Sequence, residues 1–270
     1  MGSDGTGAES GSRDEWNPDQ YLKGAMGDLR TRPAMDLLNR VLHDNPRTVV
    51  DLGCGPGNST GLLRARWPGA RVTGLDNSPN MLAKARAADP AIEWVEADIA
   101  SWQPATAPDV IFTNAALHWV PDHANLFPRL AGFLAPGGVL AVQMPGNFNA
   151  PSHTLIAEVA SDPAWAPALA GRLVGDFVQD TAFYHTLLRS TGGTPDVWET
   201  TYTQVLTGPD PVFEWVRGTA LVPVREALDD AAFDAFCETY KAQLREAYPP
   251  ADDGITLFPF RRLFITCTMT

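Results

Sequence analysis

A glycine-rich hexapeptide, GCGPGN at residues 53–58, follows directly on an apolar run that contains Asp51. Glycines between a strand and a helix let a ligand approach bare backbone. Dinucleotide-binding sites have a third small residue at the sixth position of this motif, where this chain has Asn58. The carboxylate of Asp51 would also repel a pyrophosphate, so both residues count against a dinucleotide. A carboxylate there suits a cationic group, such as the ammonium of a methionyl moiety. A plain tight turn and a dinucleotide site are the alternatives.

Two further acidic residues stand where an adenosine group would need acceptors. Asp76 closes an apolar segment, and its carboxylate can accept both hydroxyls of a ribose. Asp98 follows the next apolar segment and can accept from an adenine amino group, while Ile99 covers the ring face. The three acids follow successive segments, which predicts that they meet at one edge of a sheet.

These residues need an alternating βα framework to bring them together. Ser78 followed by Pro79 is a typical helix start, and Pro136-Gly137-Gly138 is a typical stop. Such alternation predicts βαβ units and a parallel sheet with helices on both faces. The expected strands cover residues 48–52, 71–76, 92–96, 109–114 and 139–144, and the expected helices cover residues 31–41, 58–67 and 122–134, besides the one starting at Ser78. Asn58 or Ser59 is the expected cap of the second of these helices.

The second half of the chain has a different pattern. We expect broken helix over residues 151–189, a strand at 197–205, helices at 211–221 and 230–248, and a last strand at 263–268. The chain then divides into a disordered tail (1–15), a Rossmann-like cofactor-binding half (16–150), and helical cap insertions with the last two strands of the same domain (151–270).

Composition narrows the possible partners. The formal net charge of -12 disfavours nucleic acid and anionic membranes as partners, and an anionic substrate would need a local arginine pocket. The three cysteines form no CxxC pair and no cluster with metal spacing, so no metal is expected. Without an apolar run near 18 residues or a signal-peptide pattern, we expect a cytoplasmic protein, as a monomer or weak dimer.

The motifs resemble those of the class I S-adenosylmethionine-dependent methyltransferases, and closely those of the trans-aconitate 2-methyltransferase family. The resemblance rests on WNPDQYL at 16–22, RTRP at 30–33, the glycine turn, NAALHWVPDH at 114–123 and AVQMP at 141–145. It implies a mostly parallel, seven-stranded Rossmann-like α/β sheet with a helical cap from the C-terminal half. It also implies methyl transfer from S-adenosyl-L-methionine to a carboxylate of a small polycarboxylic acid, without a metal, giving a monomethyl ester and S-adenosyl-L-homocysteine. Segments 25–29 and 217–228 depart from the family pattern, and both could line the substrate pocket.

The residues and the resemblance together assign candidate sites. The cofactor set is Tyr21, Arg32, Asp51, Gly53, Gly55, Asn58, Asp76, Asn77, Met81, Asp98, Ile99 and Asn114. The substrate set is His118, Trp119, Arg217 and Arg262. A solvated surface role is the alternative for these two arginines, as it is for Arg225 and Arg261.

His118 is the candidate catalytic residue, yet a carboxylate nucleophile is already ionised at neutral pH and requires no general base. A methyltransferase for a hydroxyl of another metabolite or natural product would instead need His118 as base. A dinucleotide-dependent oxidoreductase and a non-catalytic cofactor-binding module are further alternatives. Asn58 and Asp51 count against the first, and the polar residues after the fourth strand count against the second.

Overall fold

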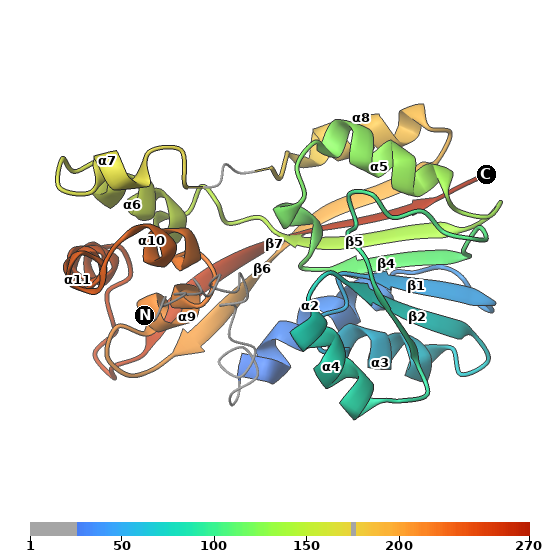
Figure 1. Ribbon diagram of the computed structural model, residues 1–270, viewed down its shortest axis with the longest axis horizontal. Helices are drawn as coiled ribbons and strands as arrows, with labels where there is room; N and C mark the ends of the chain where they lie inside the picture. Colours follow the sequence, from blue (N-terminus) through green and yellow to red (C-terminus); the bar gives the residue numbers. More distant parts are fainter. Residues whose placement is uncertain (1–25, 174–176) are drawn as a thin grey trace, which may run out of the picture.

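A seven-stranded sheet organises the protein, which we describe from a computed structural model covering residues 26–173 and 177–270 (Figure 1). The strand order is β3-β2-β1-β4-β5-β7-β6, and only β7 runs antiparallel to its neighbours. This confirms the expected Rossmann-like, mostly parallel sheet. Tyr21 and the expected tail lie outside the described residues. The strands are β1 (Thr48–Leu52), β2 (Arg71–Asp76), β3 (Glu93–Glu96), β4 (Val110–Asn114), β5 (Val139–Pro145), β6 (Thr194–Leu206) and β7 (Thr256–Thr268).

Helices cover both faces of the sheet because successive strand residues point to opposite sides. One face packs against α2 (Met26–Leu38) and α3 (Asn58–Arg66), through a core that includes Leu37, Leu63, Phe112 and Phe264. The other face packs against α5 (His123–Gly132) and α8 (Thr181–Ser190). Helix α4 (Pro79–Ala88) follows β2, and Ser78 caps it by accepting the backbone N–H of Met81, as the Ser-Pro pair predicts.

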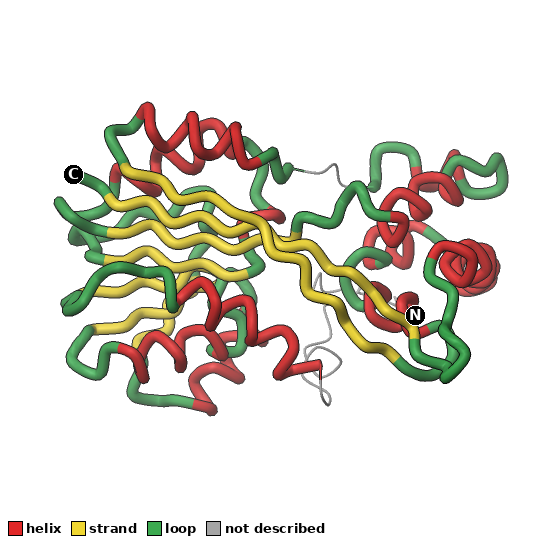
Figure 2. Tube along the Cα trace, turned by 180° about the vertical axis from the view of Figure 1, so that it is seen from behind, coloured by secondary structure: helices red, strands yellow, loops and turns green. Residues whose placement is uncertain are grey.

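The last two strands, β6 and β7, are much longer than the other strands of the sheet. β6 and β7 pair over their full 13 residues, so they run out of the sheet as a two-stranded ribbon (Figure 2). Their outer halves pack in a separate apolar core around Phe213, Phe236, Tyr240 and Phe258. The helices of this outer lobe are α6 (Pro151–Ala160), α7 (Ala166–Leu169), α9 (Pro211–Arg217), α10 (Val222–Ala227) and α11 (Asp230–Ala247).

Several expected boundaries were wrong. The strand expected at 263–268 begins seven residues earlier, at Thr256, because β6 supplies a partner outside the sheet. The helix expected at 211–221 ends early, at Arg217, and a separate helix, α10, begins at Val222. The helix expected at 31–41 begins at Met26 and ends at Leu38.

The expected cap of α3 was also wrong. Gly57 is the N-cap, with φ of 92°, and no side chain caps the helix there. The Ser59 hydroxyl instead donates to Asp51. The division of the chain at residues 15 and 150 stays a prediction.

Candidate functional site

The glycine turn after β1 is held by the two acids that precede and follow it. Asp51 is fully buried, and its Oδ2 accepts the hydroxyls of Ser59 and Thr60, each at 2.7 Å. Its Oδ1 is buried without a hydrogen-bond partner among the described residues. Burial raises the pKa of Asp51 to about 7, against the lowering effect of the two hydroxyls. An unpartnered buried carboxylate oxygen can accept a hydrogen bond from an ammonium group.

Asp76 shapes the same turn from the end of β2. Its Oδ2 accepts the backbone N–H of Gly55 at 2.8 Å, and its Oδ1 accepts that of Ser78 at 2.9 Å. Each carboxylate oxygen has a second lone pair, so the group can also accept ribose hydroxyls. Asn77 beside it is exposed, whereas Met81 is buried in the first turn of α4.

The three glycines of the turn have different surroundings. A Cβ on Gly53 would lie 2.3 Å from the Cβ of Ala116, so the turn packs directly against the segment after β4. A Cβ on Gly57 would meet the indole of Trp94 at 2.7 Å. Gly55 alone faces open space, with no atom of the described residues within 4 Å of such a Cβ. Gly55 is therefore the place where a ligand can reach the backbone.

The loop after β3 completes this edge of the sheet. Asp98 is exposed, and its Oδ1 accepts the backbone N–H of Ala100 at 2.8 Å. Ile99 is buried, and its Cδ1 would lie 3.5 Å from a Cβ on Gly53. Arg129 holds the loop by donating to the carbonyl of Ile99 at 2.7 Å. The structure thus places Asp51, Gly53, Gly55, Asp76 and Ile99 around one turn, while Asn58 is exposed.

The segment after β4 carries a strained residue and a half-buried imidazole. Ala115 has φ of 55°, an uncommon value for a residue with a side chain and one that clusters at functional sites. His118 follows in a short 3-10 helix, η1 (Leu117–Trp119), and its Nδ1 is buried without a partner among the described residues. Burial lowers the pKa of His118 to about 3, with a smaller contribution from the positive charge of Arg262. The imidazole is therefore neutral at physiological pH.

Arg262 is the cation that the structure brings to this place. It lies in β7 opposite Pro145 of β5, is 9% exposed, and stacks its guanidinium 4.4 Å from the ring centroid of Phe260. Its positive charge lowers the pKa of both His118 and Tyr202. A buried guanidinium beside a neutral imidazole favours an anionic ligand.

The other two expected arginines lie in different surroundings. Arg32 is exposed on α2, lies 5.0 Å from the ring centroid of Tyr202, and pairs with Asp36 at 3.9 Å. The positive charges of Arg32 and Arg262 both lower the pKa of Tyr202, against the larger raising effect of burial. Both arginines therefore act on the same phenol. Arg217 pairs with Glu214 at 3.6 Å on α9, in the outer lobe.

Sequence reasoning passed over Gln143 and Asn147. Both are buried near the end of β5, and both have side-chain atoms without a hydrogen-bond partner among the described residues. The available signal was a glutamine inside an otherwise apolar strand. Trp119, expected to contact substrate, is 52% exposed with its ring 4.6 Å from that of His118.

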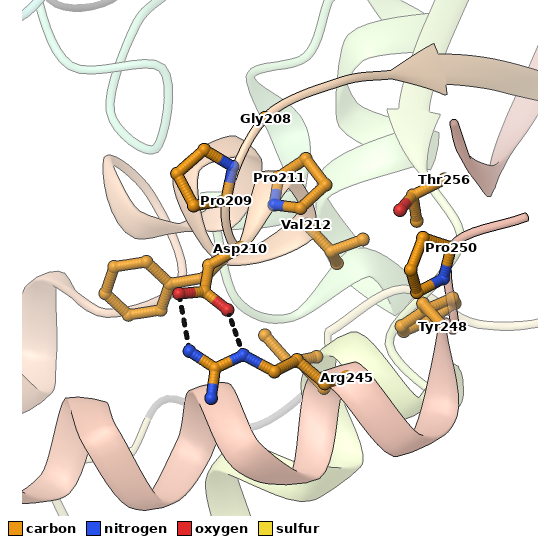
Figure 3. Close-up of a pocket in the computed structure, with 11 residues that line it drawn as sticks. Gly208, Pro209, Asp210, Pro211, Val212, Arg245, Tyr248, Pro250 and Thr256 are labelled. Carbon is orange, nitrogen blue, oxygen red and sulfur yellow. Dashed lines mark hydrogen bonds and ion pairs between the residues drawn. The ribbon is translucent and has the colours of Figure 1, made fainter. Parts of the chain in front are cut away.

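A separate cavity of about 250 Å³ lies in the outer lobe, between the loop before α9 and the end of α11 (Figure 3). Arg245 reaches across it to Asp210 through two hydrogen bonds of 2.6 and 2.8 Å. Of the expected cofactor and substrate residues that the structure describes, none lines it. Figure 1 places α9 and α11 at the end of the molecule opposite β1 and β2.

Known proteins with similar sequences identify the family. The profile of a family described as "Methyltransferase domain" matches residues 49–138, which include the glycine turn, Asp76 and Asp98. The trans-aconitate 2-methyltransferase of Azoarcus sp. (strain BH72) is 50% identical over 250 residues, covering 93% of this chain and 97% of that protein. The chain belongs to the trans-aconitate 2-methyltransferase family. As a member of that family, it is an S-adenosylmethionine-dependent methyltransferase.

A second relative supports the family assignment, and a solved structure supports the fold. The trans-aconitate 2-methyltransferase of Methylobacterium nodulans is also 50% identical, over 95% of this chain and 99% of that protein. A Haemonchus contortus phosphoethanolamine N-methyltransferase 2, solved in complex with S-adenosyl-L-methionine, is similar with a TM-score of 0.52 at 18% identity. That match covers 88% of this chain and 53% of that one, and it supports the fold alone.

Within residues 26–173 and 177–270, no group of three or more His, Cys, Asp or Glu side chains could hold a metal ion. In the same ranges, no helix has the length and apolar content needed to cross a membrane.

Proposed function

We propose that the protein methylates one carboxylate of a small polycarboxylic acid, and that trans-aconitate, which the relatives' names specify, is that acid. The observation that carries this proposal is the buried Arg262 next to His118, a half-buried imidazole whose lowered pKa keeps it neutral. An acid with several carboxylates needs a fixed cation in a protein of net charge -12. It needs no base, because its carboxylates are already ionised.

The cofactor fits the glycine turn in this proposal. The unpartnered Oδ1 of Asp51 accepts from the ammonium of the methionyl group, and the second lone pairs of Asp76 accept the ribose hydroxyls. Asp98 and Ile99 receive the adenine, and the open backbone at Gly55 permits close approach. When bound, S-adenosylmethionine supplies a methyl group on a positively charged sulfur.

The protein's own contribution to the reaction is binding, orientation and the exclusion of water. Arg262 pairs with a carboxylate of the acid, and the aromatic rings of Trp119 and Phe148 flank His118 at centroid distances of 4.6 and 6.4 Å. Removing water from a carboxylate nucleophile and aligning it are the tasks that remain when no proton must be moved.

The hydroxyl alternative fits these residues less well. A general base works best with a pKa near the working pH, and the pKa of His118 is lowered to about 3. His153, a half-buried imidazole whose charge would also act on His118, has a pKa lowered by burial to about 4. The proposal also includes a monomer or weak dimer in the cytoplasm. The acidic composition supports its further part, that neither nucleic acid nor an anionic membrane is a partner.

A direct assay tests the proposed reaction. The protein is incubated with methyl-labelled S-adenosylmethionine and a panel of di- and tricarboxylic acids and of phenols, and the products are tested for label that mild base releases. We expect base-labile label on trans-aconitate and little on hydroxylated phenols. Label that withstands base, or that appears only on hydroxyl substrates, would contradict the proposal.

A further inference from the structure

Gln143 is a polar side chain that the fold keeps buried at a cost. It is 0% exposed in β5, where the two residues before it and the one after are apolar and buried. Both its Nε2 and its Oε1 lack a hydrogen-bond partner among the described residues. Burying an unpaired amide is unfavourable, and methionine or leucine would fill the same volume without that cost. A group retained under these conditions points to a ligand that satisfies it.

Most of the unpartnered buried polar atoms in the described ranges lie near the same edge of the sheet as Gln143. Eight residues in the described ranges have such buried atoms, and six of them lie near the C-terminal ends of β1, β4 and β5. The six are Asp51, Thr113, Asn114, His118, Gln143 and Asn147. Ligands of open α/β sheets bind at this edge.

The strand register places Gln143 between Asn114 and the strand that carries Arg262. Gln143 pairs with Asn114 in β4 and with Phe264 in β7. Arg262 lies two residues before Phe264, so its side chain leaves the sheet on the same face. This is also the face that α2 covers through Leu37. The amides of Asn114 and Gln143 are therefore neighbours, with the guanidinium one step further along.

The donors and acceptors of these three groups suggest one arrangement. The neutral amide of Gln143 has an NH2 group that donates hydrogen bonds and an oxygen that accepts them, and the two can serve different partners. Asn114 can donate to the Oε1 of Gln143, which turns the Nε2 of Gln143 toward a ligand and leaves the Asn114 Oδ1 for the ammonium of the methionyl group. The Nε2 then faces a group that only accepts hydrogen bonds, next to a fixed positive charge. A carboxylate has both properties.

We infer that Gln143 binds a carboxylate of the acid substrate through its Nε2, with its orientation set by Asn114. The inference rests on the proposed function. It extends that function to a residue whose loss should weaken substrate binding and leave cofactor binding unchanged. A neutral amide holds an anion without neutralising it, so it complements Arg262 rather than duplicating it.

Three variants test the inference. Gln143→Met keeps the volume and removes both polar groups, whereas Gln143→Glu places a negative charge against the carboxylate. Gln204→Met is the matched control, because Gln204 is a buried glutamine, 6% exposed, in β6 opposite Phe258 in the outer lobe. For each variant, we measure the thermal midpoint, the affinity for S-adenosylhomocysteine by calorimetry, and kcat and KM for trans-aconitate.

For Gln143→Met we expect an unchanged or higher thermal midpoint, because an unpaired buried amide has been removed. Its kcat/KM should fall about 10- to 100-fold, mostly through KM, with S-adenosylhomocysteine affinity within about threefold of wild type. Gln143→Glu should lose more, and Gln204→Met should match wild type in its kinetics. If Gln143→Met folds poorly, Gln143→Asn, which withdraws the amide by one methylene, gives the same KM comparison.

Two results would overturn the inference in distinguishable ways. A wild-type KM in Gln143→Met, with wild-type protein active on trans-aconitate, removes the role of Gln143 and leaves the proposed function intact. A wild-type protein that does not methylate the acid overturns both. A fall in the thermal midpoint of Gln143→Met, with KM unchanged, would assign the amide a structural role.

Discussion

Gly53 and Ala116 lie so close that a Cβ on the glycine would be 2.3 Å from the Cβ of the alanine. This contact joins the cofactor turn after β1 to the segment after β4 that carries His118. Because φ of Gly53 is 70°, a side chain there would also impose a left-handed backbone. The glycine turn and the segment that carries His118 therefore pack as one unit.

The first prediction follows from that contact. Gly53→Ala should lower the free energy of unfolding by more than about 2 kcal/mol, since it adds a clash to the backbone cost of roughly 1–2 kcal/mol. Gly55→Ala has a similar φ of 54° but open space, so it should cost only the backbone part. Urea unfolding of both variants checks this. Equal losses in the two would mean that the contact with Ala116 yields easily.

The second prediction concerns Asp76. Asp76→Ala should weaken S-adenosylhomocysteine binding by roughly 1.5–3 kcal/mol, because a charged acceptor and the support of the Gly55 N–H are both lost. Calorimetry with S-adenosylhomocysteine, and with NAD as a ligand expected not to bind, makes the measurement. An unchanged affinity would place the ribose elsewhere.

The third prediction concerns the pH dependence of cofactor binding. The pKa of Asp51 is raised to about 7 in the free protein, well above its usual value, so the carboxyl is largely protonated at pH 6. Pairing with an ammonium requires the ionised form, and the proton must leave. S-adenosylhomocysteine should therefore bind about tenfold more tightly at pH 8 than at pH 6, and Asp51→Asn should lose this dependence. Equal wild-type affinities at the two pH values would exclude the pairing.

The same shift has a consequence for stability, with a defined sign. The folded protein holds the proton of Asp51 more tightly than the unfolded chain does. The free energy of unfolding should therefore fall as pH rises from about 4 to about 7, relative to Asp51→Asn. The comparison of urea midpoints across this range isolates the contribution of the one carboxyl. A parallel pH dependence in both proteins would show that Asp51 does not cause it.

The fourth prediction concerns His118. Because the pKa of His118 is lowered to about 3, protonation of this imidazole should not reduce kcat between pH 5 and 8 at saturating cofactor. The pH profile of kcat in His118→Asn should therefore have the same shape as that of the wild-type protein over this range. His118→Ala should reduce kcat by less than about tenfold, whereas loss of a general base costs on the order of 10²- to 10⁴-fold. A loss of about 10³-fold, together with an acid limb, would favour a hydroxyl substrate.

The fifth prediction separates the arginines. Arg262→Ala should lower kcat/KM for trans-aconitate by roughly 2–4 kcal/mol, about 30- to 1000-fold, because a desolvated carboxylate loses its partner. Arg262→Lys should recover only part, since the planar fork is lost. Arg217→Ala is the control, since Arg217 is half-exposed and paired with Glu214, and it should stay near wild type. If Arg217→Ala loses as much as Arg262→Ala, the outer lobe contributes to the substrate pocket.

Local patterns in the sequence determined the parallel strands, the glycine turn and the acids that surround it. An apolar run that ends in an acid, followed by glycines, can be read without knowing what lies opposite, and β1 and β2 fell at their expected bounds. Strand order then places Asp51 and Asp76 at one edge by the general geometry of parallel sheets.

Other features depended on partners remote in sequence, and only the tertiary structure decided them. Arg262 looks like any surface arginine until β7 sets it opposite Pro145, buried and close enough to affect His118. Gln143 differs from a chance polar residue in a strand only because nothing described in the fold satisfies its amide. Burial and hydrogen-bond satisfaction are sums over non-local neighbours, so a local pattern of residues does not contain them.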